Sequence, residues 1–385
     1  MFADRTNWNL EENRLSRALA LRRAGGDSVI DLSASNPTTC GFKFDEAAIL
    51  RAFADPEALR YVPDPRGMPA ARAAVCDYYA GHGVKIFPEE IFLTTGTSEA
   101  YSFIFRTLCN PGDEILIATP SYPLFDFLAD INDVRLAPYS LLYDHGWQID
   151  FNSLERAIGP RTRAAIVVHP NNPTGHYAKA NEAAVLADIC ARHDMALIAD
   201  EVFYDFSFRE QKPATFAAEN RALTFVLSGL SKIAGLPQMK AGWIVTAGPE
   251  RMKLDALATI EVIADTYLSM NAPVQCALPA LLEMRRDFQS QLMERAAKNL
   301  ATLDAQLVSH PQCSRLEIEG GWNVVLRVPV MRSDEEAAID LVGSRGVYVH
   351  PGHFYDFAGD GHMVVSLIVE PGQFCEGIAR ALEFF

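Results

Sequence analysis

The sequence predicts an α/β protein with a large domain, built on a mostly parallel sheet flanked by helices, and a smaller α+β domain formed by both ends of the chain. Short apolar runs recur along the chain with helical patterns between them, which predicts the large domain. Near residue 275 this alternation gives way to a long polar helical pattern, which predicts the smaller domain. We expect the large domain over residues 46–272 and the small domain over residues 1–45 and 273–385.

The runs are short and apolar on both faces, which is typical of strands buried in a parallel sheet. The expected strands are Glu114–Ala118, Ala164–Val168, Ala196–Ala199, Leu223–Leu227 and Gly242–Val245. Apolar residues at helical spacing, among them Tyr101, predict helices over Ser98–Leu108 and Glu182–Arg192. In the small domain we expect a helix over Asp287–Leu307 and alternating strands over Trp322–Val328 and Met363–Ile368. A ligand of such a fold binds at the carboxyl ends of the parallel strands.

Composition excludes several classes of protein. Of the 385 residues 49% are hydrophobic, enough to form a core, and the net charge of −15 is unfavourable for non-specific nucleic-acid or anionic-lipid binding. No apolar run approaches the ~18 residues that span a bilayer, and the first residues lack the apolar region of a signal peptide, so we expect a soluble, cytoplasmic protein. The 7 scattered cysteines include no CxxC pair and no Cys/His cluster, which predicts reduced thiols and no metal site.

Small and polar residues follow several of the apolar runs. Gly96, Thr97 and Ser98 open a predicted helix, where free backbone N–H groups form a natural phosphate seat, although the same residues also serve as a simple helix cap. The segment His169–Gly175, with Asn172 inside it, is either an ordinary turn or a rigid support that points an amide at a ligand.

Charged residues follow two further runs. Asp200 and Glu201 end one run in a way that also resembles the magnesium-binding strand of P-loop ATPases, but no Gly-Lys pair exists for a P-loop. Lys232 follows another run among small residues, where a desolvated amine would act as a nucleophile. Lys240, eight residues later, would by itself be interpreted as a surface residue.

The order of these motifs resembles the class I/II aminotransferase family of fold type I pyridoxal-phosphate-dependent enzymes. The motifs are TGTSEA, PSYPLF, PNNPTG, ADEVF and LSGLSK followed by a second lysine, and the resemblance spans roughly residues 30 to 375. It implies pyridoxal 5'-phosphate as cofactor and a homodimer as the active unit.

The resemblance also implies roles for individual residues. Lys232 would form the internal aldimine and then move the substrate α-proton, and Asp200 would pair with the pyridinium nitrogen. Asn172 would donate to the 3-oxygen of the ring, and Tyr122 would stack on the face of the ring. The implied phosphate ligands are Gly96, Thr97, Ser98, Ser231, Lys240 and, from the neighbouring subunit, Tyr61.

The chain departs from the family pattern on the substrate side. Val364 stands two residues before Ser366, where members that act on α-amino acids usually carry an arginine for the substrate carboxylate. We consider Arg66, Arg327 and Asn36 as substrate-binding candidates.

Three departures concern the cofactor. Phe203 replaces a tyrosine that usually donates to the 3-oxygen, unless the adjacent Tyr204 takes its place. Lys240 replaces an arginine, which keeps the charge but loses the two-pronged hydrogen bonding. Gly229 replaces a serine three residues before Lys232, so Ser231 or Ser228 is left to supply a hydroxyl.

Three functions remain open at this point. The first is transfer of an amino group from an amino donor, such as an amino acid, to a 2-oxo acid through ping-pong half-reactions. The second is other pyridoxal-phosphate chemistry on the same fold, such as that of a β-lyase, a decarboxylase or a cyclising synthase. The third is a cofactor-binding protein without turnover, whose usual form carries a DNA-binding module for which this chain has no spare length or basic segment.

Overall fold

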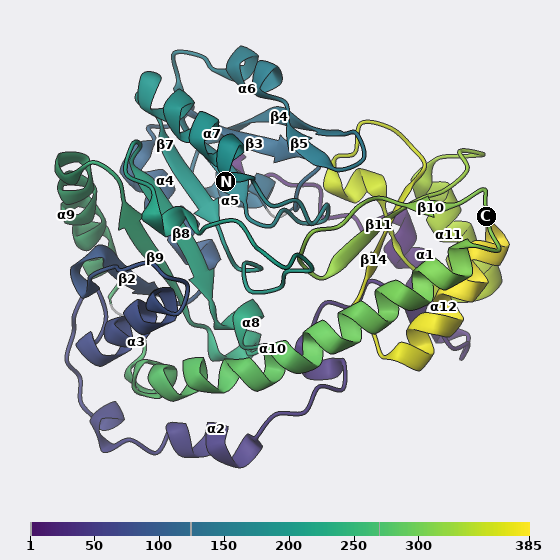
Figure 1. The fold of residues 1–385 in the computed structure, drawn as a ribbon, viewed down its shortest axis with the longest axis horizontal. Helices are drawn as coiled ribbons and strands as arrows, with labels where there is room; N and C mark the ends of the chain where they lie inside the picture. Colours follow the sequence, from purple (N-terminus) through teal and green to yellow (C-terminus); the bar gives the residue numbers. More distant parts are fainter. Residues whose placement is uncertain (1, 124, 269) are drawn as a thin grey trace.

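The computed structural model describes residues 2–123, 125–268 and 270–385. In this part of the chain the larger sheet has eight strands in the order β2-β9-β8-β7-β6-β3-β4-β5 (Figure 1). Their bounds are β2 Ile91–Thr94, β3 Glu114–Thr119, β4 Arg135–Tyr143, β5 Trp147–Ile149, β6 Thr162–Val168, β7 Ala196–Asp200, β8 Thr224–Gly229 and β9 Gly242–Ala247.

The sheet is mostly parallel, as the sequence predicts. The pairs β8–β7, β7–β6, β6–β3 and β3–β4 are parallel, whereas β9 runs antiparallel to both β8 and β2, and β5 runs antiparallel to β4. Every residue of β7, β8 and β9 is buried, because helices cover both faces of the sheet. All five apolar runs form strands, and the last of them, in β9, is the antiparallel one.

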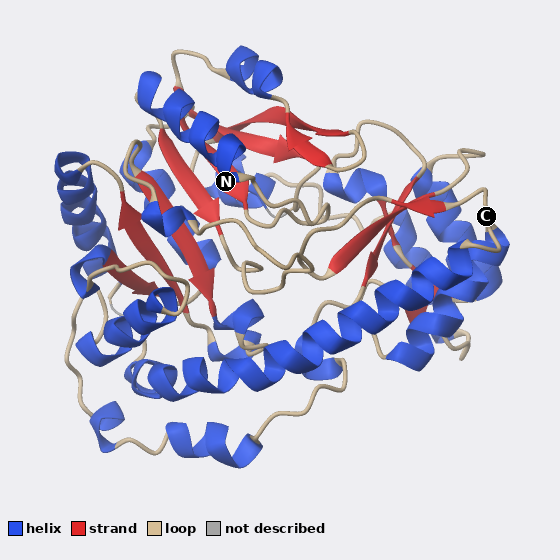
Figure 2. Ribbon diagram, in the orientation of Figure 1, coloured by secondary structure: helices blue, strands red, loops and turns tan. Residues whose placement is uncertain are grey.

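Helices flank the larger sheet, and further helices lie beside the smaller sheet (Figure 2). The α-helices are α1 Arg14–Ala24, α2 Glu46–Ala52, α3 Pro69–Ala80, α4 Thr97–Leu108, α5 Phe125–Ile131, α6 Phe151–Ala157, α7 Ala180–Arg192, α8 Leu230–Ile233, α9 Glu250–Tyr267, α10 Ala272–Leu307, α11 Asp334–Arg345 and α12 Pro371–Phe384. The 3-10 helices are η1 Asp4–Thr6, η2 Pro37–Thr39, η3 Pro56–Leu59, η4 Pro88–Glu90, η5 Phe216–Ala218, η6 Pro237–Met239 and η7 Gly352–Tyr355. Both helices expected in the first 200 residues are confirmed, as α4 and α7. No helix in the described ranges is both long and apolar enough to cross a membrane.

A second, antiparallel sheet has the order β10-β11-β14-β13. Its strands are β10 Ser314–Arg315, β11 Asn323–Arg327, β13 His350–Pro351 and β14 His362–Ser366, so the two alternating segments form β11 and β14. The short strand β1 (Ile30–Asp31) pairs in parallel with β12 (Val347–Tyr348), which joins the beginning of the chain to its end. This pairing agrees with a small domain built from both termini, whose boundaries stay a prediction.

The helix expected over Asp287–Leu307 is longer than the sequence indicated. It begins at Ala272, where the Asn271 side chain accepts a hydrogen bond from the Val274 N–H and caps the first turn. The helix continues through Pro279, which lies in its third turn. Figure 1 shows α10 running beneath both sheets. One end of α10 packs against α3 and the other against α12, so this helix connects the two parts of the molecule.

Candidate active site

Three predicted residues meet at one edge of the larger sheet. Asp200 is the last residue of β7, and Lys232 lies three residues after the end of β8, in the short helix α8. Asn172 lies four residues after the end of β6. In the registers of the sheet Asp200 is paired with Val168 on one side and with Leu227 on the other. The carboxyl ends of three adjacent parallel strands therefore bring these side chains together.

Asp200 is buried and carries two hydrogen bonds. The Tyr101 hydroxyl donates to Oδ2 at 2.9 Å, and the Val202 N–H donates to Oδ1 at 3.1 Å. Burial raises the pKa of the Asp200 carboxyl to about 6, although these two donors and the Lys232 charge act in the opposite direction. A buried carboxylate of this kind stabilises a cation or an N–H donor placed beside it.

The Lys232 amine is desolvated and faces aromatic rings. Its Nζ atom lies 4.9 Å from the centre of the Trp322 ring and 5.6 Å from the centre of the Phe203 ring. Burial lowers the pKa of Lys232, and the Asp200 charge opposes this shift only in part. The lowered pKa favours the neutral amine, which is the form that attacks a carbonyl carbon.

The choice between Phe203 and Tyr204 follows from where the two side chains point. The Phe203 ring is the one beside Lys232. The Tyr204 hydroxyl donates to the Pro213 carbonyl at 3.0 Å, and the Lys212 amine lies over its ring. Tyr204 is therefore occupied elsewhere and does not supply the hydroxyl that Phe203 lacks.

Asn172 is oriented by a residue that the sequence analysis did not single out. The Asn323 amide Nδ2 donates to Asn172 Oδ1 at 2.7 Å, which leaves the Asn172 amide N–H₂ group to donate to a ligand. The neighbouring Asn171 has a different role, since its amide donates to the Pro120 carbonyl and to the Thr174 hydroxyl within the protein. Asn323 begins β11, in the segment that its alternating pattern marked only as a strand.

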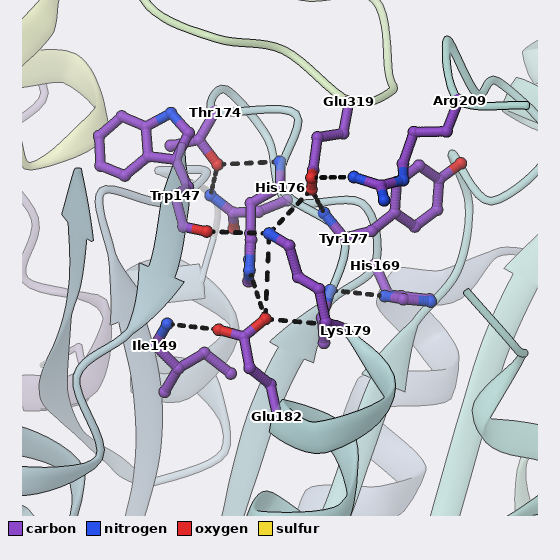
Figure 3. Close-up of polar contacts among 12 residues, drawn as sticks. Trp147, Ile149, His169, Thr174, His176, Tyr177, Lys179, Glu182, Arg209 and Glu319 are labelled. Carbon is purple, nitrogen blue, oxygen red and sulfur yellow. Dashed lines mark hydrogen bonds and ion pairs between the residues drawn. The ribbon is translucent and has the colours of Figure 1, made fainter. Parts of the chain in front are cut away.

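Two carboxylates hold the segment that follows Asn172 (Figure 3). Glu182 accepts hydrogen bonds from the N–H groups of Lys179 and Ile149 and lies 3.0 Å from His176 Nε2. Burial raises the pKa of the Glu182 carboxyl, but His176 and the backbone donors outweigh burial and bring that pKa to about 2. Glu182 is thus an ionised anchor for the loop.

The second carboxylate, Glu319, reaches this loop from the segment that leads into β11. Glu319 accepts a hydrogen bond from the Tyr177 N–H at 3.0 Å and forms ion pairs with Lys179 at 3.0 Å and Arg209 at 2.5 Å (Figure 3). Trp322 and Asn323 follow Glu319 within four residues. This ion-pair network therefore fixes both sides of the contact between Asn323 and Asn172.

The predicted phosphate seat lies at the N-terminus of α4. Gly96 caps this helix with a φ of 154°, and a Cβ atom there would lie 3.7 Å from Lys240 Nζ. A Cβ atom on Gly242 would lie 3.0 Å from Gly96, so β9 and this turn are in close contact. The helix end with Thr97 and Ser98, and the Lys240 ammonium, thus combine N–H donors with a positive charge.

Gly229, which the sequence marks as a departure from an expected serine, is required by local packing. Gly229 lies at the end of β8, and a Cβ atom there would come within 2.6 Å of the Ala241 carbonyl oxygen. This oxygen and the Gly242 Cα, 2.9 Å from the same Cβ, belong to the backbone at the start of β9, which pairs with β8, so neither can move aside. Ser231 is half-buried in α8, one residue before Lys232.

The remaining candidates lie farther from these groups or have other partners. Tyr122 is 44% exposed, and the preceding Ser121 has a buried hydroxyl without a partner in the described residues. Tyr61 is 76% exposed on the loop before α3. The Asn36 side chain caps η2 by accepting from the Thr38 N–H, which leaves its amide N–H₂ group for other partners.

The two arginine candidates are not equivalent. The Arg66 guanidinium is held by Glu261 at 2.6 Å. Arg327 is exposed at the far end of β11 from Asn323 and lies over the Tyr143 ring, 5.6 Å from its centre. Val364 is buried on β14 and pairs with Val325, so no cation stands at that position.

The fold places the chain among proteins of known structure. An aminotransferase from Escherichia coli superimposes with a TM-score of 0.88 at 21% identity, covering 100% of this chain and 98% of the other. Alanine aminotransferase from Pyrococcus furiosus gives a TM-score of 0.88 at 24% identity, with 100% and 99% of the two chains covered. The protein therefore has the fold of the fold type I aminotransferases.

Sequence comparison identifies the family. The model of the family "Aminotransferase class I and II" matches residues 27–367, so the chain belongs to this family of pyridoxal-phosphate-dependent enzymes. Alanine aminotransferase of Mycobacterium tuberculosis is 27% identical over 356 residues, which cover 88% of this chain and 81% of the relative. Glutamate-pyruvate aminotransferase AlaA of E. coli is 26% identical over 259 residues, and this match spans 67% of the chain and only 64% of the relative.

The residues present fit pyridoxal 5'-phosphate, the cofactor of the family. The Gly96 turn and Lys240 suit its phosphate, and Asp200 suits its ring nitrogen. Lys232 offers an amine to its aldehyde, and the free amide donor of Asn172 suits its ring oxygen. The buried Ser121 hydroxyl, which has no partner among the described residues, is a further donor beside Tyr122.

Proposed function

We propose that this chain catalyses pyridoxal-phosphate-dependent transamination, in which an amino acid gives its amino group to a 2-oxo acid. The observation that carries the proposal is that a desolvated amine, Lys232, and a buried carboxylate, Asp200, lie at the same edge of the sheet, close enough for the charge of each to shift the pKa of the other. When bound there, the cofactor withdraws electrons from the substrate α-carbon and stores the amino group between the two half-reactions.

Each residue of the site has a separate role in the proposed reaction. Lys232 is the amine that attaches the cofactor and, once released by the substrate, takes the α-proton and returns it. Asp200, in its ionised form, would hold the ring nitrogen of the cofactor protonated. Asn172 binds the ring oxygen and Tyr122 covers the ring, while the α4 N-terminus, Ser231 and Lys240 bind the phosphate.

The proposed active unit is a homodimer in which Tyr61 of one copy reaches the phosphate site of the other. Tyr61 lies on a loop with Leu59, which is 90% exposed, and Val62, which is 67% exposed. Exposed apolar residues gathered on one loop are typical of a protein interface.

A cytoplasmic location remains a prediction from the sequence.

The test of the reaction is a panel of amino acids and amines added singly to the holoprotein, with the cofactor absorbance recorded. A true donor converts the aldehyde form of the cofactor to its amine form, and a 2-oxo acid restores the original spectrum. Release of ammonia or of another leaving group without the amine form would instead indicate elimination chemistry. Borohydride should fix the cofactor on Lys232, and a label on any other peptide would refute the assignment.

The test of the crossed site is a mixture of two inactive variants. Tyr61→Ala lacks the donated side chain and Lys232→Ala lacks the amine, but a mixed dimer contains one site with both residues intact. Refolding the two variants together should restore part of the activity. Activity that stays absent in a confirmed mixed dimer would refute the crossing.

A further inference from the structure

One face of the small sheet is directed at the active site. Asn323 on β11 contacts Asn172, and side chains two residues apart on a strand share a face, so Val325 lies on this face too. Directly paired residues of antiparallel strands also share a face, which adds Val364 of β14 and, through Val364, His350 of β13. His350 thus stands beside Val364 on the face that looks toward Asn172.

His350 is the titratable residue in the row that contains Val325 and Val364. This row lies about 7 Å along the strands from Asn323, since two residues of a strand span that length. Arg327 lies on the same face but one row farther away, and its guanidinium covers Tyr143. His350 is therefore closer to the active site along the sheet than the nearest arginine of β11.

A tyrosine links His350 to the cofactor side of the site. The Tyr355 hydroxyl lies 3.0 Å from His350 Nδ1, and the Tyr355 carbonyl accepts a hydrogen bond from the Ser121 N–H at 2.9 Å. Ser121 directly precedes Tyr122, the residue proposed to cover the cofactor ring. The imidazole is thereby held in one orientation, with Nδ1 engaged and Nε2 left for a ligand.

We propose that His350, oriented by Tyr355, binds the substrate carboxylate in the place of the arginine that Val364 replaces. The inference rests on the proposed function, because every 2-oxo acid and every α-amino acid brings a carboxylate to the site. An imidazolium donates a charge-assisted hydrogen bond to a carboxylate, as an arginine does, but only while it is protonated.

Whether His350 is protonated depends on the groups around it. Burial lowers the pKa of the imidazole, and the Asp31 carboxylate on β1 opposes this shift. The Tyr348 ring on β12 and the Tyr355 hydroxyl on η7 are the other titratable groups in contact with it. On the opposite face of the sheet, α11 packs with apolar side chains. A bound carboxylate adds a negative charge, so binding and protonation of His350 strengthen each other.

The experiment measures binding to the holoenzyme by calorimetry, without turnover. The probes are 3-phenylpropionate and its uncharged amide, and the quantity is the ratio of their dissociation constants at pH 6 and at pH 8. The wild-type protein should prefer the carboxylate at pH 6 by at least tenfold and lose most of this preference at pH 8. His350→Gln should abolish the preference at both pH values, and His350→Arg should retain it at both. Tyr355→Phe should weaken it at pH 6.

His353→Gln is the matched control, because His353 is exposed on the neighbouring η7 and should not affect the ratio. A wild-type protein that does not distinguish the two probes, or a His350→Gln variant that keeps the preference, would overturn the inference. Loss of the preference in Arg327→Gln alone would assign the carboxylate to Arg327 instead. Since no probe is turned over, failure of the donor panel would refute the proposed reaction and leave this result unchanged.

Discussion

Replacing Asp200 by asparagine should stabilise the protein when the cofactor is absent. The folded chain places this carboxyl, 7% exposed, where burial raises its pKa to about 6 from an ordinary value of 3.8. Above pH 6 the folded state therefore carries a buried negative charge that is poorly compensated. The difference of roughly 2 pKa units, at about 1.4 kcal/mol for each unit, corresponds to about 3 kcal/mol of lost stability at neutral pH.

Asparagine removes this cost and keeps the hydrogen bonds. Its side-chain oxygen accepts from the Val202 N–H as Oδ1 of Asp200 does, and its amide donates to the Tyr101 hydroxyl, which reverses its role. The folded pKa of Asp200 lies above the unfolded value, so this carboxyl costs no stability below about pH 4 and costs progressively more as the pH rises from about 4 to 6. The advantage of the variant should grow over that range and be constant above it.

The assay is urea unfolding of the two apoproteins at several pH values between 5 and 8. Asp287→Asn, an exposed position on α10, is the control for the chemical change alone. Addition of pyridoxal 5'-phosphate should reverse the order of stability, because the protonated ring nitrogen compensates the carboxylate only in the wild type. An Asp200→Asn apoprotein that is no more stable than wild type at pH 8 would refute the electrostatic argument.

Three further substitutions test a hydrogen bond, a close backbone contact and an open helix position that the structure shows. Asn323→Ala should raise the dissociation constant of pyridoxal 5'-phosphate by about fivefold to tenfold, the effect of about 1 kcal/mol for a hydrogen bond, because Asn172 loses the partner that orients its amide. A fluorescence titration of the apoprotein measures this constant, and an unchanged value would contradict the role of Asn323. Gly229→Ala should destabilise the protein by about 1 to 3 kcal/mol, because its methyl group would approach the Ala241 carbonyl. Gly343→Ala in α11, where a Cβ atom meets nothing within 4 Å, should stabilise it by about 0.5 to 1 kcal/mol in the same urea titration.

The residues that the sequence predicted best are those whose position follows from one strand and its end. Asp200, Lys232 and Asn172 each come shortly after a run that is apolar on both faces, and parallel strands align their ends. The position of Glu201, which follows Asp200 directly, can be explained in the same way. Alternation along the chain sends its carboxyl away from Asp200, to accept from the Thr215 hydroxyl and the Phe216 N–H, so adjacent acids have separate roles.

Other residues could not be predicted because their partners lie far away in the sequence. Tyr101 fits the apolar periodicity of its helix, and this pattern carries no information on the hydroxyl that reaches Asp200 from 99 positions away. Arg66 is a substrate candidate in the sequence alone because its carboxylate partner, Glu261, lies 195 positions away. The helix α10 begins earlier than the sequence indicates because Asn271 caps it. Pro279 would normally end a helix, but here packing of α10 against both parts of the molecule keeps the helix continuous.

The division of the site between the two sheets implies that cofactor affinity and substrate choice are largely separable. Most groups proposed for the phosphate and the ring nitrogen belong to α4, β7 and α8, and Lys240 lies two residues before β9, so these groups are positioned by the larger sheet. Val364 and His350 belong to the small sheet, and Asn323 of the same sheet contacts Asn172, a proposed cofactor ligand. If the proposed assignments hold, substitutions on β13 and β14 should change which carboxylate is accepted without weakening cofactor binding, whereas a change at Asn323 should affect both. The proposal that Val364 stands in the place of an arginine agrees with this arrangement, since β14 carries neither Lys232 nor Asp200, which are held by the larger sheet.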